Sequence, residues 1–131
     1  MNQLQPAQIV QFARRFRFAD GRVLRIRMRQ PMTGRAAGEI VLRVLSADRG
    51  EKQRLRIVIH HVEEFRFQRR PGQSKSRLKD VKIGYFNGLF YLNLDPYADD
   101  SPPALHDFRA SDAFIAGREF AWEIVTPRPK T

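Results

Sequence analysis

Arginines at alternate positions are the side chains whose type and spacing most directly suggest chemistry in this chain. Side chains two residues apart point to the same face of a β-strand. If the segments that carry them are neighbours, their guanidinium groups share one surface, and such a surface attracts polyanions by releasing counterions. The candidates for this polyanion-binding face are Arg15, Arg17, Arg25, Arg27, Arg29, Arg43, Arg54 and Arg56.

The charge is distributed unevenly along the chain, which has a net charge of +10. Residues 1–82 contain 20 basic and 7 acidic side chains, whereas residues 83–131 contain 4 basic and 7 acidic ones. Arg outnumbers Lys by 19 to 5, a ratio that the codon composition of a genome can produce. Codon composition does not explain why the base-rich and acid-rich parts are separate.

Three interpretations of the arginines remain open. They form a solvated sheet face paired with Glu39, Glu63, Glu64 or the acidic last third of the chain, or they bind an external polyanion such as nucleic acid. The same charge pattern also fits self-association. Phe16 and Phe18 occupy the opposite parity from the arginines, which predicts that they are core residues and disfavours base stacking.

A second group of polar residues supports only a weak metal hypothesis. Asp95, Asp99, Asp100 and Asp107 form an acidic loop of the kind that can hold a hard cation, but no EF-hand spacing is present. His60 and His61 are adjacent, so on a regular strand they point to opposite faces and cannot bind one metal without a bulge.

The residues needed for catalysis are scarce. The chain has no Cys, its serines fall in loop-like segments, and no Gly-rich loop of the phosphate-binding kind precedes a helix. Ser111, His106 and Asp107 are close in sequence, but a triad is defined by geometry. We therefore expect no enzyme and no cofactor.

Hydrophobic periodicity and turn residues predict how these side chains are positioned. A short helix is expected near Pro6–Phe16, a bulge near His61, and inward-facing Leu24, Ile26 and Met28. Hairpins are expected at Asp20-Gly21, Asn87-Gly88 and Ala116-Gly117-Arg118. About eight short strands without a long crossover helix predict an all-β fold, a single-domain antiparallel β-sandwich or open barrel.

Length and composition set the remaining expectations. One domain over residues 1–126 and a disordered tail over residues 127–131 suit a chain of 131 residues. The beginning of the chain lacks a charged segment followed by an apolar one, and the apolar runs are short. We expect a cytoplasmic protein that has no membrane partner.

Three stretches together resemble a diffuse group of uncharacterised small bacterial β-sandwich proteins, some of them similar to immunity proteins of toxin systems. They are Phe16-Arg17-Phe18-Ala19-Asp20-Gly21, the run from Leu55 to Phe65, and Phe114 through Trp122-Glu123. The resemblance implies a binding protein without catalytic residues. An immunity protein that neutralises a basic nuclease is expected to be acidic, and only the last third of this chain is.

These observations favour a non-enzymatic binding module with an unknown protein partner or a second copy of itself. The first alternative is nucleic-acid binding through the arginine-rich sheet face. The second is cation binding or catalysis that uses the Asp95–Asp107 loop.

Overall fold

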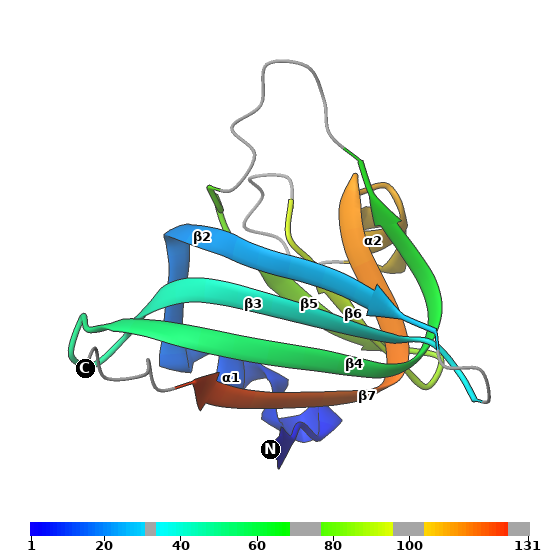
Figure 1. The fold of residues 1–131 in the computed structure, drawn as a ribbon, viewed down its shortest axis with the longest axis horizontal. Coiled ribbons are helices and arrows are strands. Elements are labelled where there is room, and N and C mark those ends of the chain that lie inside the picture. Colours follow the sequence, from blue (N-terminus) through cyan, green and yellow to red (C-terminus); the bar gives the residue numbers. More distant parts are fainter. Residues whose placement is uncertain (31–33, 69–76, 96–103, 126–131) are drawn as a thin grey trace.

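The computed structural model describes residues 1–30, 34–68, 77–95 and 104–125, and within them it confirms the predicted antiparallel all-β fold. A single open sheet of seven strands has the order β2-β3-β4-β7-β6-β5, with β1 also paired to β7 (Figure 1). The strands are β1 (Asn2–Gln3), β2 (Phe16–Arg29), β3 (Ala37–Ser46), β4 (Lys52–Phe67), β5 (Lys82–Phe86), β6 (Leu89–Asn93) and β7 (Ala113–Val125). The helices are a 3₁₀ turn (Pro6–Gln8), α1 (Ile9–Arg15) and α2 (Leu105–Arg109).

The long strand β7 holds the two parts of the sheet together. Its whole length pairs with β4, its first half pairs with β6 on the other edge, and β1 pairs near its far end. The β5–β6 hairpin therefore lies behind β2, β3 and β4, and the sheet curls around one core (Figure 1). The other surface of β2, β3 and β4, called here the outer face, points away from that core.

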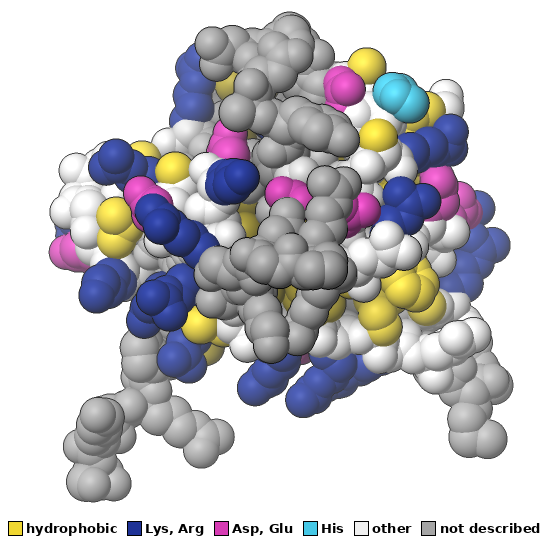
Figure 2. All heavy atoms as spheres, turned by 90° about the horizontal axis from the view of Figure 1, so that it is seen from above, with side chains coloured by type: hydrophobic (Ala, Val, Ile, Leu, Met, Phe, Trp, Pro, Cys, Tyr) yellow, Lys and Arg dark blue, Asp and Glu magenta, His cyan; other side chains and the backbone are white. Residues whose placement is uncertain are grey.

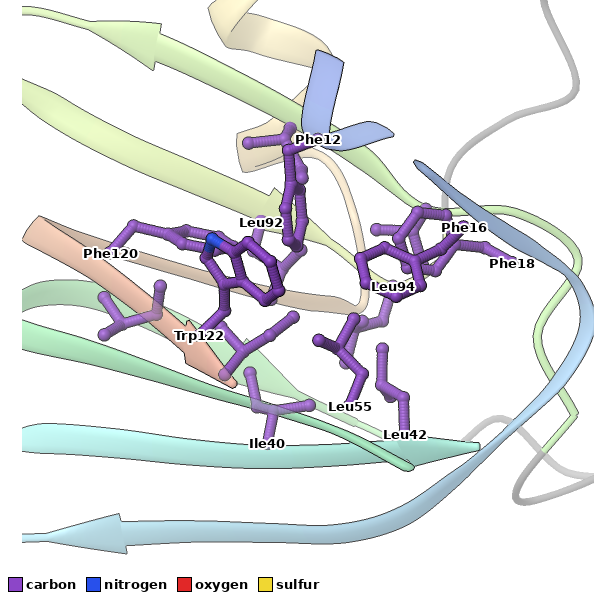
Figure 3. Close-up of a cluster of buried hydrophobic side chains, with 14 of the residues drawn as sticks. Phe12, Phe16, Phe18, Ile40, Leu42, Leu55, Leu92, Leu94, Phe120 and Trp122 are labelled. Atoms are coloured by element: carbon purple, nitrogen blue, oxygen red, sulfur yellow. The ribbon is translucent and has the colours of Figure 1, made fainter. Parts of the chain in front are cut away.

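The helix α1 closes the core at its open side. Phe12, its one buried residue, sits with its ring centroid 5.5 Å from that of Phe120 and 5.1 Å from that of Trp122. Phe16, the first residue of β2, packs edge-on against the same Phe12 ring at 5.4 Å. Figure 3 shows these rings above the fully buried aliphatic side chains of β3 and β4, Ile40, Leu42 and Leu55.

A second, smaller cluster forms where α2 covers β6. Phe108 is fully buried and lies 5.6 Å from the Tyr91 ring, which stacks on Phe114. This helix replaces the last part of the acidic loop expected from Asp95 to Asp107, so that expectation is wrong from Leu105 onward. Residues 96–103 lie outside the described part of the chain.

The three expected hairpins had different outcomes. Asn87 and Gly88 both have positive φ and join β5 to β6, as predicted. The hairpin at Asp20-Gly21 is wrong because β2 continues through it. Asp20 does have φ 65°, but a Cβ on Gly21 would lie 2.7 Å from the Arg43 carbonyl oxygen, so the chain bends there against β3.

The hairpin expected at Ala116-Gly117-Arg118 is also wrong, because β7 is continuous there. A Cβ on Gly117 would lie 2.6 Å from the His60 carbonyl oxygen, so this glycine permits a close approach of β4. The approach occurs beside the predicted bulge, which is present: His61 has φ 54° and the pairing register shifts between Val62 and Glu64.

The predicted inward face of β2 is partly wrong. A register shift between Val23 and Arg25 leaves Leu24 without a partner on β3 and places Val23 beside buried Leu42. Leu24 is 42% exposed, and Ile26 is 39% exposed although it pairs with buried Ile40. A bulge of this kind changes the side-chain parity, which strict alternation does not anticipate.

Several expectations fall on residues that the structure does not describe. These are the disordered tail expected from 127 to 131 and, in the acidic loop, Asp99 and Asp100. Among the helices that are described, none is long and apolar enough to cross a membrane.

If α1 closes the core, Phe12→Ala should lower the free energy of unfolding by about 3–5 kcal/mol, the usual cost of removing a buried phenyl ring. Val10→Ala, at an exposed position of the same helix, should change it by less than about 0.5 kcal/mol. Chemical denaturation of both variants measures this. Similar losses in the two would contradict the packing of α1.

Candidate functional site: the outer arginine face

Seven of the eight predicted arginines lie on the outer face of the sheet. The register places Arg54 beside Arg43, and Arg25 and Arg56 on either side of Val41. Arg27 lies beside Glu39, Arg29 beside Ala37 and Arg17 beside Leu45. This face is turned toward the reader in Figure 1, and Lys and Arg side chains line the corresponding lower edge of Figure 2.

Arg15 is the exception, because it belongs to α1 and not to a strand. Its guanidinium lies 4.9 Å from the Trp122 ring centroid and 5.8 Å from that of Phe16, at a distance suited to cation–π contact. It also lines a hollow of ≈ 400 Å³ between the end of α1 and the β3–β4 turn. Alternate spacing failed here because the helix ends at Arg15 and the strand begins at Phe16.

A buried carboxylate organises one half of the outer face. The Glu39 side chain is 8% exposed and accepts hydrogen bonds from Arg56 at 3.0 and 2.8 Å and from Arg25 at 3.5 Å. Arg56 also donates to Glu123 at 3.0 Å. Hydrogen bonds from Arg56 hold the pKa of the Glu39 carboxyl below its usual value, with a smaller effect from Arg25, although burial opposes this.

The other half of the outer face carries an arginine row, formed by Arg22, Arg43 and Arg54 directly side by side on three adjacent strands. Within the described ranges no carboxylate forms an ion pair with any of the three. Arg17 and Lys52 extend the positive charge, because both lie beside Leu45 in the next position along the sheet. Like charges directly opposite each other destabilise a sheet, so the row is a place where an anion would lower the free energy.

Two members of this half, Arg22 and Lys52, were missed by the sequence analysis. The hairpin predicted at Asp20-Gly21 left Arg22 out of the candidate face, and only the continuity of β2 brings it next to Arg43. Lys52 was also left out of the candidate face, although its spacing of two from Arg54 continues the alternation and was the available signal.

The remaining acids predicted as partners pair with arginines elsewhere. Glu63 lies 3.0 Å from Arg118 and 3.5 Å from Arg35. Glu64 accepts hydrogen bonds from both Arg109 and the Tyr91 hydroxyl, and these hold its pKa below the usual value, Arg109 contributing more. This contact anchors α2 to β4 and β6 and is separate from the outer face.

The acidic segment shows structural roles where it is described. Asp107 accepts a hydrogen bond from the Ala104 backbone at the start of α2. The buried Ser111 hydroxyl donates to Asn93 at 2.7 Å.

Asp99 and Asp100 lie outside the described residues, and in the described ranges no three His, Asp or Glu side chains are grouped to hold a metal ion. His60 is half-buried and His61 is exposed.

No protein-family model matches the chain, and neither a curated protein nor a solved structure matches it. The resemblance to immunity proteins therefore stays a prediction.

The Glu39 contacts give a pH-dependent prediction for stability. Glu39→Gln should lower the free energy of unfolding by about 1.5–3 kcal/mol at pH 7, because hydrogen bonds to a charged group are lost while Arg56 remains. A lowered pKa means that the native state binds fewer protons than the unfolded state. The difference from wild type should thus be complete above the usual Glu pKa of 4.5 and shrink as the pH falls through the lowered value.

Denaturant unfolding between pH 7 and pH 3 measures this difference. Glu119→Gln is the matched control, since Glu119 is an exposed carboxylate paired in register with His60 and has no ion pair with any described residue. It should change stability by less than about 0.5 kcal/mol. A Glu39→Gln effect that does not depend on pH would contradict the assigned contacts.

Proposed function

We propose that the protein is a non-enzymatic binding module that holds an acidic partner protein against the outer face of β2, β3 and β4. The observation that carries this proposal is the arginine row, where Arg22, Arg43 and Arg54 stand side by side with no ion pair to a described carboxylate. An arrangement of this kind is costly in the free protein and becomes favourable when carboxylates of a partner approach.

Two features of the outer face favour an acidic protein over a nucleic acid. In the described strands the positions that the register places on the outer face carry no Phe, Tyr or Trp, because Phe16, Phe18 and Trp122 are buried in the core. Phe65 of β4 is exposed, but it pairs with buried Ile115 on the core side. Single-stranded nucleic acids are usually held by stacking on exposed rings. In addition, Glu39, Glu119 and Glu123 lie on the same face and would repel a continuous phosphate backbone, whereas a protein partner can match a mixed pattern.

The half of the outer face that contains Glu39 is already neutralised, and this limits where a partner can bind. Glu39 and Glu123 already hold Arg56 in place, and Glu39 holds Arg25, so these two guanidinium groups are less available to a partner. The arginine row is therefore where acidic groups of a partner bind. The half of the face around Glu39 limits how far these groups spread along the strands.

The proposal predicts that Arg43→Gln weakens binding to an acidic polypeptide severalfold more than Arg14→Gln does. Both variants remove one exposed arginine, but Arg14 lies on α1 and not on a strand of the outer face. Fluorescence anisotropy with poly-glutamate at several salt concentrations measures the affinities. Binding should weaken as salt rises because exposed charges are screened.

A DNA duplex in the same assay separates the two partner classes. If the duplex binds, poly-glutamate does not, and Arg43→Gln weakens the duplex, then the partner is a nucleic acid and the proposed class is wrong. Equal effects of the Arg43 and Arg14 variants, or no binding of either polymer at low salt, would rule out the arginine row as the site.

A further inference from the structure

The strand β2 is an edge of the sheet along most of its second half. On the side away from β3, the start of β2 pairs with residues 77 and 78. Arg22 forms a β-bridge with Arg77, and Leu78 forms backbone hydrogen bonds with Asp20 and Gly21. The described pairing ends at Arg22. From Val23 to Arg29 no strand in the described part of the chain pairs with this side. A strand edge that no other strand covers presents its N–H and C=O groups to a further strand.

The side chains along this edge alternate in character. Arg25, Arg27 and Arg29 point to the outer face, and Ile26 and Met28 point to the core side. Ile26 remains 39% exposed, and Leu24 in the bulge is 42% exposed, so apolar surface borders the open edge. The opposite edge strand, β5, is shorter, and Ile83 and Gly84 in it are buried.

This alternation determines which strand fits. An added strand would place every second side chain beside the arginines and the others beside Ile26 and Met28. A second copy of β2 would bring arginines opposite arginines, which is unfavourable. A strand in which acidic residues alternate with apolar ones would instead pair opposite charges on the outer face and cover the exposed aliphatic groups on the core side.

We propose that the edge of β2 from Val23 to Arg29 binds an extended acidic segment of a partner protein by strand addition. The inference rests on the proposed function, because it assigns how the acidic partner docks beside the arginine row. Backbone hydrogen bonds to β2 supply affinity, Arg27 and Arg29 select acidic side chains, and Ile26 and Met28 select apolar ones between them.

The test uses the intact protein and a short capped peptide in which Glu alternates with Val. Three matched peptides isolate the contributions. One carries N-methyl groups on the amides of one edge, one has the same residues with all Val grouped together, and one has Lys in place of Glu. Titration calorimetry gives the affinities, and amide hydrogen exchange locates the contact.

The alternating peptide is expected to bind, to protect amides between Val23 and Arg29, and to lose at least about tenfold in affinity when N-methylated, since several hydrogen bonds are then removed. The grouped and Lys peptides should bind more weakly. In the protein, Arg27→Gln should weaken the alternating peptide more than Arg14→Gln. Arg27 suits this test because it forms no ion pair with any described residue.

Other outcomes overturn the inference in distinguishable ways. Equal binding of the methylated, grouped and alternating peptides, all weakened by Arg43→Gln, would leave the arginine row as the site and exclude strand addition. No binding of any acidic peptide or of poly-glutamate would reject both proposals. Protection of the β2 edge amides without peptide, together with a concentration-dependent dimer in sedimentation, would show that a second copy occupies the edge.

Discussion

The electrostatic constraint on the outer face dominates this structure. Three neighbouring strands place arginines on one surface, at separations where unpaired charges repel each other. Glu39 relieves part of that repulsion from the middle strand, because its carboxylate lies between Arg25 on β2 and Arg56 on β4. A single carboxylate on β3 thus bridges all three strands through hydrogen bonds between charged groups, which are stronger than neutral ones, although the burial of its side chain offsets part of that gain.

The position of Glu39 explains why the face divides into two parts. Among the described residues, Glu39 forms ion pairs with Arg25 and Arg56 and also attracts Arg29, and Glu123 on β7 adds a second contact to Arg56. Farther along the strands, β7 contributes Val125 beside Arg54 and offers no carboxylate. The arginine row therefore follows from the register of four strands, and it persists because the core beneath it holds that register.

Much of the fold was predictable from local sequence signals. Hydrophobic alternation identified the long strands, and Asn87-Gly88 identified the β5–β6 turn because both residues adopt positive φ easily. The errors at Asp20-Gly21 and Gly117 have one physical cause. Glycine permits a turn, but it also permits close packing against the backbone of a neighbouring strand, here β3 or β4. A sequence alone cannot show which of the two a given glycine does.

The candidate site was predictable in composition but not in detail. Period-two spacing placed seven arginines correctly on one face. It could not show which of them form ion pairs with Glu39, because that depends on the strand register. The arginine row involves Arg22, which only a continuous β2 brings beside Arg43. A bulge at Leu24 likewise exposed an aliphatic side chain that alternation assigned to the core.

These register effects bear on whether the arginines merely reflect genome composition. Codon composition can raise the number of arginines, but it does not decide which of them lie next to a carboxylate. Here one end of the face has Glu39, Glu119 and Glu123 among its arginines. The other end has Arg17, Arg22, Arg43, Lys52 and Arg54, and the carboxylate of β2 at that end, Asp20, is paired with Arg77. The arginine row adjoins the edge of β2 that, from Val23 onward, pairs with no strand among the described residues. As far as the chain is described, arginines without an ion pair, exposed aliphatic groups and backbone groups without a strand partner thus occur together on β2, and a single acidic strand would match all three.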